Sequence, residues 1–481
     1  MELIFNKSIP GHKGYSLPTC DVPEQSIPAL IPEKYLRDTP PELPEIAEPE
    51  VIRHFSLLSQ QNYAVDTQFY PLGSCTMKYN PKVNERISRF TGFMQLHPLA
   101  DEDSAQGTLQ LLYEMEQSLN QIFGFDAFTF QPAAGAHGEL TAMMMVKQYF
   151  LDIGELQRKK IIIPHTAHGT NPASAALCGF EVIEIESDEQ GNIDIAELKK
   201  QLDTSIAGVM ITNPNTLGLF DEHIIEIADM VHRIGAILYG DGANANALLG
   251  KTRYGDLGFD MLHLNLHKTF SAPHGGGGPG SGPVGVKSKF IPYLPKPLLI
   301  KKEDKYTFDY TRPKSIGRIH SFYGNIGVII KAYAYLRSLG PEGLKSVTEQ
   351  AVLSANYLKK LVEPILEVPY SRPCMHEFVA SAEKLMAETG VKTLDIAKRL
   401  LDYGTYAPTI YFPLTVKEAL MIEPTETENK QTLDTFAKAL ESIVQESRDH
   451  PELVKSAPHT MPVSRLDEVT AARQPNLKYK K

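Results

Sequence analysis

Through the middle of the chain, segments with the hydrophobic pattern of a strand are followed by segments with the pattern of a helix. Short apolar runs predict strands, and longer runs of helix-forming residues between them predict helices. Strands that take turns with helices indicate an α/β domain, with ligands bound beyond the carboxyl ends of the strands. The strands are predicted at 125–131, 160–164, 180–186 and 207–212, and around Asp241 and Lys268, and the helices at 139–153 and 221–234.

The pattern changes on either side of this region. Residues 1–60 are rich in proline, which predicts an extended arm that wraps a neighbour. A helix around Val347–Leu361, a strand at Thr409–Leu414 and a helix at 430–446 predict a smaller α+β domain. The expected organisation is an arm over 1–60, a large α/β domain over 61–330, a small C-terminal domain over 331–455 and a tail over 456–481.

Composition narrows the class of partner. The chain has 481 residues, more than one core usually holds, and a formal net charge of -10, which argues against a nucleic-acid partner. Its four cysteines are scattered without metal-ligand spacing, as suits a reducing compartment. No apolar run approaches a membrane span and no secretory signal is visible, so we expect a cytoplasmic protein without a membrane partner.

One lysine stands where an apolar strand meets a glycine-rich loop. Lys268 follows the run that begins at Met261 and precedes the loop Gly275–Gly282. In a crevice at a sheet edge, partial desolvation disfavours the ammonium form and leaves a nucleophilic amine, which can hold an aldehyde as a Schiff base. The alternative for this lysine alone is a side chain that extends from a strand end to solvent.

An aspartate ends the apolar strand upstream of this lysine. Asp241 is followed at once by small residues, among them Ala243. The pyridine nitrogen of pyridoxal phosphate needs an anionic partner to stay protonated, and small residues let its ring approach the backbone. Asp241 and Ala243 are therefore candidates for contacts with such a ring, and an N-cap of the next helix is the alternative role for Asp241.

A turn of small residues precedes the helix that reaches residue 153. Ala134, Gly135 and Ala136 lie in this turn, after a strand with alternating aromatic residues. Backbone N–H groups and the positive end of a helix dipole together form an anion site. The spacing matches neither the P-loop nor the dinucleotide fingerprint, so it favours a phosphate that does not belong to a nucleotide.

Two histidines follow the β-branched strand at 160–164. His165 and His168 have the i, i+3 spacing of a metal pair, but no cysteine or carboxylate cluster accompanies them, so we predict no metal site. His168 is expected instead to stack on an aromatic cofactor. A structural role is the alternative for both histidines.

Together these segments resemble the glycine decarboxylase family, the P-proteins of the glycine cleavage system. The resemblance extends from residue 1 to about residue 455, and the length is similar to that of the second subunit of the two-chain bacterial form. The motifs that carry it are Pro-Leu-Gly-Ser-Cys-Thr-Met-Lys at 71–78, Ala-His-Gly-Thr-Asn-Pro-Ala-Ser at 167–174, Asp-Gly-Ala-Asn at 241–244, and Asn-Leu-His-Lys-Thr-Phe with its glycine loop at 265–282.

The resemblance implies fold type I of the pyridoxal-phosphate-dependent enzymes, the aspartate-aminotransferase-like fold, for the large domain. It implies pyridoxal 5'-phosphate as a Schiff base on Lys268, with Asp241 at the pyridine nitrogen and His168 on the ring as the other catalytic residues. It also implies decarboxylation of glycine, with transfer of the aminomethyl group to the lipoyl arm of H-protein. The implied partners are a separate first subunit and lipoylated H-protein.

Further candidates come with the resemblance. Asn213 or Thr216 is expected to hydrogen-bond the phenolic oxygen of the cofactor, or only to shape a turn. The segment Ser74, Cys75 and Thr76 matches an active-site mouth, in which Cys75 is either a redox-sensitive or an inert thiol. The remaining candidates are His267 beside the cofactor, and His137, Thr170, Asn171 and His376 near the substrate or the mouth, with packing as the alternative for His376.

Two other interpretations use the same residues. Another fold type I enzyme, such as an amino-acid decarboxylase or a cysteine desulfurase, would share the lysine, the aspartate and the histidine. A scaffold subunit whose partner holds the cofactor is disfavoured, because the lysine, the aspartate and the phosphate turn all occur on this chain.

Overall fold

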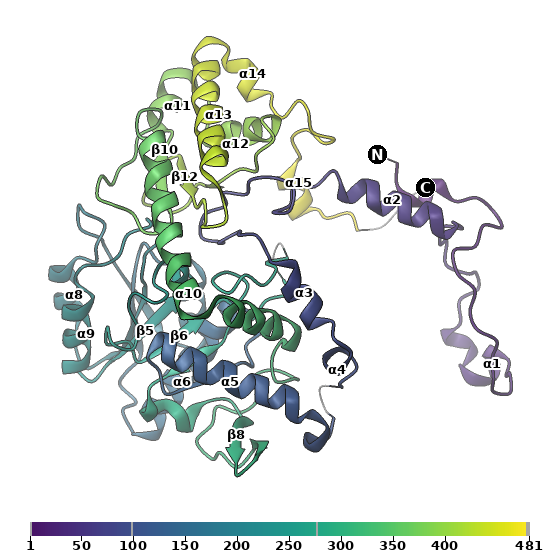
Figure 1. Ribbon diagram of the computed structural model, residues 1–481, viewed down its shortest axis with the longest axis horizontal. Helices are drawn as coiled ribbons and strands as arrows, with labels where there is room; N and C mark the ends of the chain where they lie inside the picture. Colours follow the sequence, from purple (N-terminus) through teal and green to yellow (C-terminus); the bar gives the residue numbers. More distant parts are fainter. Residues whose placement is uncertain (1, 98–99, 276–277, 478–481) are drawn as a thin grey trace. The chain divides into compact units, whose positions relative to one another are not determined.

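The computed structural model describes residues 2–97, 100–275 and 278–477. The chain forms two compact units, one made of residues 1–64 with 460–481 and one made of residues 65–459 (Figure 1). Gly276 and Gly277 of the glycine loop, and residues 478–481 of the predicted tail, lie outside the described residues.

A seven-stranded sheet is the centre of the unit 65–459. Its strand order is β1-β7-β6-β5-β4-β2-β3. Strands β2 to β6 are parallel to their neighbours in this group, whereas β7 is antiparallel to both β1 and β6. The strands are β1 (Ala127–Thr129), β2 (Lys160–Pro164), β3 (Glu181–Ile185), β4 (Ile206–Thr212), β5 (Ile237–Gly242), β6 (Met261–Leu264) and β7 (Val284–Val286).

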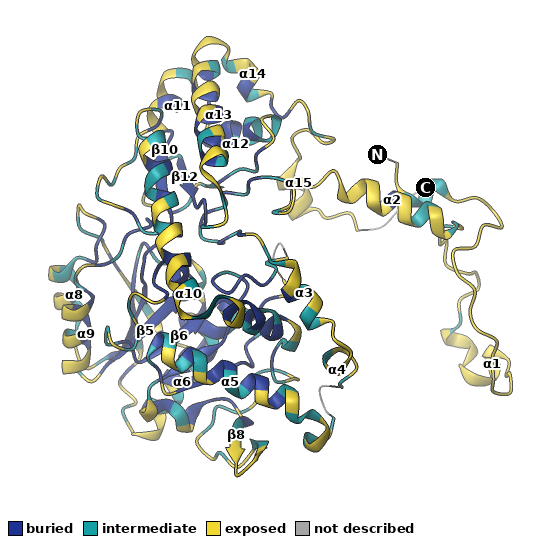
Figure 2. Ribbon diagram, viewed as in Figure 1, coloured by how far each residue is buried: buried dark blue, intermediate teal, exposed yellow. Residues whose placement is uncertain are grey.

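Helices cover both faces of this sheet. Successive residues of β4 point to opposite faces, so Val209 and Ile211 join one apolar core and Met210 joins the other. Burial on both faces explains why the central strands are continuous apolar runs, and they are dark blue in Figure 2. The first core includes residues of α5 (Gln106–Phe123), α9 (Ile224–Arg233) and α10 (Ile326–Val362), and the second includes residues of α6 (Gly135–Asp152) and α7 (Thr170–Leu177).

A three-stranded antiparallel sheet has an apolar core of its own within the same unit. Its order is β10-β12-β11, and Phe378 of β10 pairs with Ile422 of β12. This is the sheet of the predicted small domain, although the domain boundary at residue 331 stays a prediction. The elements are β10 (Phe378–Ser381), β11 (Thr409–Ile410), β12 (Ala419–Ile422), α11 (Glu383–Thr389), α12 (Thr393–Asp402), α13 (Lys430–Asp449) and α14 (Pro451–Lys455).

Helix α10 continues from the large sheet to this small core and is interrupted once. Gly340 has a φ of 63°, which glycine adopts without a steric penalty, and it precedes Pro341, which has no N–H to donate. The helix predicted around Val347–Leu361 is therefore the second half of a longer one. The unit also contains α3 (Lys82–Ser88), α4 (Thr91–Met94), α8 (Ile195–Gln201) and the hairpin of β8 (Leu298–Lys302) with β9 (Lys305–Asp309).

The structure also corrects the extent of the strand predicted at Thr409–Leu414 and the extended conformation predicted for residues 1–60. The strand predicted at Thr409–Leu414 ends at Ile410, because Tyr411 has a φ of 57° and leaves the extended conformation. Residues 1–60 are not wholly extended, since they contain α1 (Ile27–Leu30) and α2 (Glu48–Ser59). Pro49 lies in the first turn of α2, where a helix tolerates proline.

Helix α2 is exposed along most of its length (Figure 2). It buries His54. The same unit contains α15 (Glu468–Arg473). None of the helices in the described ranges is both long and apolar enough to cross a bilayer.

Candidate active site

Lys268 lies in a turn beyond the carboxyl end of β6. The predicted strand ends earlier than expected, at Leu264, and the Lys268 N–H donates to the carbonyl oxygen of Asn265 at 3.0 Å. The side chain is only partly buried. This turn places the amine at the carboxyl edge of the parallel strands, where ligands bind in open α/β sheets.

The positive charge of Lys268 acts on groups from several segments. Burial opposes ionisation of Asp241, but the neighbouring His263, the Ala243 N–H and Lys268 outweigh it and hold the pKa of Asp241 below its usual value. Partial desolvation lowers the pKa of His168, although its ring keeps some exposure to solvent, and Lys268 lowers the pKa further. The three predicted catalytic residues thus share one electrostatic environment.

Asp241 is buried in β5 and accepts three hydrogen bonds. Its Oδ2 accepts from Asn171 Nδ2 at 3.1 Å and from Thr212 Oγ1 at 3.3 Å. Its Oδ1 accepts from the Ala243 N–H at 2.9 Å. The following short helix has Asn244 as its N-cap, so the capping role considered for Asp241 is not the one observed. Asp241 is an ionised carboxylate held in a fixed orientation.

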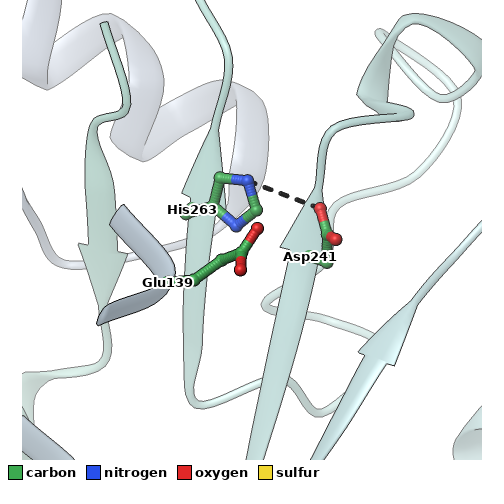
Figure 3. Close-up of side chains that lie close together, drawn as sticks. All are labelled: Glu139, Asp241 and His263. Atoms are coloured by element: carbon green, nitrogen blue, oxygen red, sulfur yellow. Dashed lines mark ion pairs between the residues drawn. The ribbon is translucent and has the colours of Figure 1, made fainter. Parts of the chain in front are cut away.

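Glu139, Asp241 and His263 point toward one another below this strand edge (Figure 3). The Nε2 of His263 lies 3.4 Å from Asp241 Oδ1 and 3.0 Å from Asn265 Oδ1, and its Nδ1 lies 2.6 Å from the Tyr239 hydroxyl. Burial lowers the pKa of His263, so the ring is neutral. A carboxylate only accepts, so Nε2 carries the proton and Nδ1 accepts from Tyr239.

Glu139 is the protonated member of this cluster at neutral pH. Burial, followed by the negative charge of Asp241, raises the pKa of Glu139 to about 8. Its Oε1 accepts from the Thr170 hydroxyl at 2.8 Å. The cluster therefore concentrates its negative charge on Asp241, the residue predicted to face a pyridine nitrogen.

His168 is exposed on the loop after β2. Its Nδ1 lies 2.9 Å from the Thr170 hydroxyl, and its ring meets Phe412 edge to face, with centroids 5.8 Å apart. Thr170 and Asn171 join this loop to the acidic cluster, through Glu139 and Asp241 respectively. His165 instead lies 2.8 Å from Glu186, so the two histidines do not act as a pair.

Helix α6 begins at the predicted phosphate turn. Ala134 is its N-cap and Gly135 is its first residue. A Cβ on Gly135 would come within 2.6 Å of the Asn265 side chain, so glycine permits the close approach of this turn to the chain after β6. His137 Nδ1 accepts from the Ala133 N–H at 3.2 Å, and Ala136 is exposed.

The end of the glycine loop packs against the same turn. The Gly282 N–H donates to the carbonyl oxygen of Pro132 at 3.1 Å. His267 Nδ1 accepts from the Ser281 N–H at 3.3 Å, and burial followed by the charge of Lys268 lowers the pKa of His267 to about 3. The Ser281 hydroxyl is buried and has no hydrogen-bond partner within the described part of the chain. It is an unused donor beside a helix N-terminus.

Asn213 and Thr216 differ in whether a side-chain hydrogen-bond donor is free. The Thr216 hydroxyl already donates to the carbonyl oxygen of Thr166 at 2.5 Å. Asn213 Oδ1 accepts from the Asp221 N–H at 3.0 Å, but its Nδ2 is buried without a partner among the described residues. Of the two, Asn213 is the residue with a free donor.

A second cluster lies at the predicted mouth. The Ser74 N–H donates to Glu377 Oε2 at 2.7 Å, and the Thr76 N–H donates to Glu423 Oε2 at 2.9 Å. His376 is fully buried beside both carboxyl groups. Burial raises the pKa of the Cys75 thiol, which lies between the two bonded residues, and this favours the protonated, inert form.

Several residues of these clusters were not among the sequence candidates. His263 and Asn265 alternate along the predicted strand toward Lys268, and Ser281 stands in the quoted glycine loop, so a signal for these three was present. Glu139 resembled an ordinary helix residue. Glu377 and Glu423 meet only because β10 pairs with β12, which no local pattern reveals.

Comparison with known proteins agrees with this geometry. Residues 347–459 match the family described as glycine dehydrogenase, C-terminal domain, and residues 137–277 match aminotransferase class-V. A crystal structure of glycine decarboxylase (P-protein) of the glycine cleavage system superposes with a TM-score of 0.74 at 20% identity, covering 86% of this chain and 94% of that chain. The fold and the site define a pyridoxal-phosphate-dependent enzyme of fold type I.

Closer relatives identify the family. The probable glycine dehydrogenase (decarboxylating) subunit 2 of Bacillus velezensis is 57% identical, covering 100% of this chain and 97% of that protein. The protein of the same description from Thermotoga petrophila is 56% identical, covering 99% of each chain. The chain belongs to the glycine dehydrogenase (decarboxylating) subunit 2 family.

Proposed function

We propose that this chain carries the catalytic site of a two-subunit glycine decarboxylase. In the overall reaction, glycine loses its carboxylate as CO2, and its aminomethyl group forms a C–S bond to one lipoyl sulfur of H-protein while the other sulfur becomes a thiol. The observation that carries the proposal is that Lys268 lies beyond the carboxyl edge of the sheet with its charge acting on Asp241 and His168. Family membership supports the choice of glycine.

The residues present fit pyridoxal 5'-phosphate. Asp241 is a buried, ionised carboxylate, as a protonated pyridine nitrogen requires. The Ser281 hydroxyl and Asn213 Nδ2 are buried donors without partners among the described residues, and they would serve the phosphate and the phenolic oxygen. The N-terminal turn of α6 supplies backbone N–H groups for the phosphate.

Each predicted residue then has a definable task. The Lys268 amine would hold the aldehyde of the cofactor and exchange it for the amine of glycine. When bound, the cofactor supplies an electron-accepting ring for the pair released from the Cα–carboxylate bond. Asp241 would hold a proton on the pyridine nitrogen, Asn171 and Thr212 fix the orientation of Asp241, and the exposed His168 ring would offer a face for stacking.

A second subunit is part of this proposal. The relatives are described as subunit 2, which supports a separate first subunit as partner. The lipoyl arm of H-protein is the proposed acceptor, since the matched structure is described as the P-protein of the glycine cleavage system. Ser74 would then line the entrance used by glycine or by the arm, with the buried Thr76 and His376 behind it.

The test is exchange of labelled bicarbonate into the carboxyl group of glycine. We expect exchange when the purified chain is mixed with pyridoxal phosphate, the first subunit and lipoylated H-protein. We expect little exchange when any one of these components is left out. Full activity without the first subunit would replace the two-subunit proposal by a self-sufficient enzyme. Sulfur release from cysteine, with no glycine exchange, would identify a cysteine desulfurase instead. Absence of cofactor absorbance from this chain in the full mixture would support the scaffold interpretation.

A further inference from the structure

Three ionisable side chains meet in the interior between the small sheet and the loop at Ser74. His376 and Glu377 immediately precede β10, and Glu423 immediately follows β12. The antiparallel pairing of Phe378 with Ile422 brings these two chain segments together. All three side chains are fully buried, so the cluster belongs to the interior and not to a solvated acidic surface.

The facing atoms of these side chains have no partners. His376 Nε2 lies 3.8 Å from Glu377 Oε1 and 4.0 Å from Glu423 Oε1, and both separations are too long for hydrogen bonds. Within the described part of the chain, all three of these atoms lack a hydrogen-bond partner. An unpartnered buried polar atom is costly, so a shared ligand at this point removes three such costs at once.

The cluster at Asp241 provides a contrast. Glu139, Asp241 and His263 also lie close together, but each is bonded to neighbouring side chains or N–H groups, and none is among the unpartnered buried atoms. Proximity alone therefore does not distinguish the two clusters. The distinguishing feature at His376 is a set of three mutually close polar atoms that lack hydrogen-bond partners among the described residues.

The outer oxygens of the two carboxyl groups are already fixed. Glu377 Oε2 accepts from the Ser74 N–H and Glu423 Oε2 accepts from the Thr76 N–H. Ser74 and Thr76 have φ values of 64° and 46°, so the loop adopts a conformation unfavourable for such residues where it makes these bonds. Hydrogen bonds of this kind orient metal-ligating carboxylates and leave one oxygen of each for the ion.

Burial raises the pKa of both Glu377 and Glu423, so either protons or a cation must neutralise the pair. Among the described residues, no lysine or arginine forms an ion pair with Glu377 or Glu423. The nearby buried Lys78 is paired with Glu426 instead, at 2.8 Å. Two carboxylates in a buried site repel each other, and a single doubly charged ion neutralises both.

We propose that His376, Glu377 and Glu423 form a three-ligand site for one divalent cation of the zinc or manganese class. One imidazole and two carboxylates are ligands that such ions accept, and three protein ligands leave a position open. Bonds from zinc to nitrogen and oxygen are about 2.0–2.2 Å long, so two ligand atoms on one ion can be up to about 4 Å apart. The observed separations of 3.8 and 4.0 Å lie at this limit and need only a slight closure.

The ion would tie the loop at Ser74–Thr76 to the small sheet beside Lys268. The sequence predicted no metal site, because its ligands come from two distant segments and only their pairing as β10 and β12 unites them. The site does not depend on the proposed reaction, so its test does not use turnover.

The test is direct binding to the untagged full chain after dialysis against a chelator. We expect calorimetric titration with Zn²⁺ or Mn²⁺, and metal analysis after gel filtration, to give one ion per chain. Glu377→Gln and Glu423→Gln should each weaken binding more than tenfold. Glu116→Gln, which alters a buried carboxyl group outside the cluster, is the matched control and should bind like the parent chain.

A second measurement uses the parent chain alone, in case a variant fails to fold. Pulsed electron paramagnetic resonance of the bound Mn²⁺ should show one coordinated imidazole nitrogen. Failure of the parent chain to bind one ion, binding without a nitrogen ligand, or equal binding by the two cluster variants and Glu116→Gln would each overturn the proposal.

Discussion

The Nζ of Lys78 lies 2.8 Å from the carbonyl oxygen of Thr269, the residue that follows Lys268. The same fully buried ammonium group bonds Glu426 Oε1 and Asn246 Oδ1, each at 2.8 Å. Burial acts to lower the pKa of Lys78, but Glu426 and Tyr335 outweigh it and hold the pKa above its usual value. A structural lysine therefore fixes the turn that carries the candidate catalytic lysine.

This arrangement predicts a large effect of Lys78→Met on stability. The substitution leaves Glu426 nearly buried without its cation, and such a change costs about 3–5 kcal/mol. Adding Glu426→Gln should recover part of the loss, because no lone charge remains. Denaturant unfolding measures the free energy of unfolding of the single and the double variant. Lys82→Met is the control, because the exposed pair of Lys82 with Asp66 contributes at most about 1 kcal/mol. A loss no larger than that of the control would contradict the role assigned to Lys78.

Sequence patterns correctly predicted those features of the site that lie within a single segment of the chain. Strand β2 occupies its predicted range, Asp241 lies one residue before the end of a buried strand, and α6 begins within the predicted turn. Each of these depends on side-chain periodicity or on small residues at a helix start, which are visible in the sequence.

The other parts depend on contacts between distant segments. The bonds of Ser74 and Thr76 to Glu377 and Glu423 depend on the pairing of the small sheet, and no spacing in the chain reveals them. Helix α2 was missed for another reason. Proline indicates extended chain in general, but Pro49 occupies the first turn, where its missing N–H has no cost.

Lys268→Ala should abolish attachment of the cofactor while the chain stays folded. The amine is only partly buried, so its removal opens no apolar cavity. The measurement is borohydride reduction in the presence of pyridoxal phosphate, followed by mass spectrometry of the chain. Lys251→Ala, at an exposed lysine, should be labelled like the parent. Undiminished labelling of Lys268→Ala would assign the aldehyde to another lysine.

Asp241→Asn should retain the cofactor and lose rate. A neutral amide cannot stabilise a protonated pyridine nitrogen, and each 1.4 kcal/mol of lost stabilisation is roughly a tenfold loss of rate, so a fall of orders of magnitude is expected. Glycine exchange and cofactor absorbance are measured together. Asp260→Asn is the matched control, because Asp260 is also buried but pairs with His232 and Lys289 instead. A rate for Asp241→Asn within a factor of about two of the parent would remove Asp241 from the mechanism.

Glu116 should make the stability of the chain depend on pH. It lies in α5, its Oε1 accepts from the Phe128 N–H at 3.1 Å, and burial raises its pKa from the usual 4.5 to about 7. The folded state therefore holds this proton more tightly than the unfolded state. The stabilising contribution is complete below pH 4.5, is lost as the pH rises to about 7, and is constant above that.

Comparison with Glu116→Gln isolates this effect, because the amide oxygen still accepts from Phe128 but does not titrate. Between pH 4.5 and 8, the unfolding free energy of the parent relative to the variant should fall by roughly 3 kcal/mol, at 1.36 kcal/mol for each pKa unit. Thermal and denaturant unfolding at several pH values measure this difference. Glu114→Gln is the control on the same helix, because hydrogen bonds from Tyr333 and Gln110 lower the pKa of Glu114. The contribution of Glu114 to stability is therefore lost only as the pH falls, and it is nearly constant from pH 5 to 8. Parallel pH profiles for the parent and Glu116→Gln would show that Glu116 ionises in the folded chain as readily as in the unfolded one.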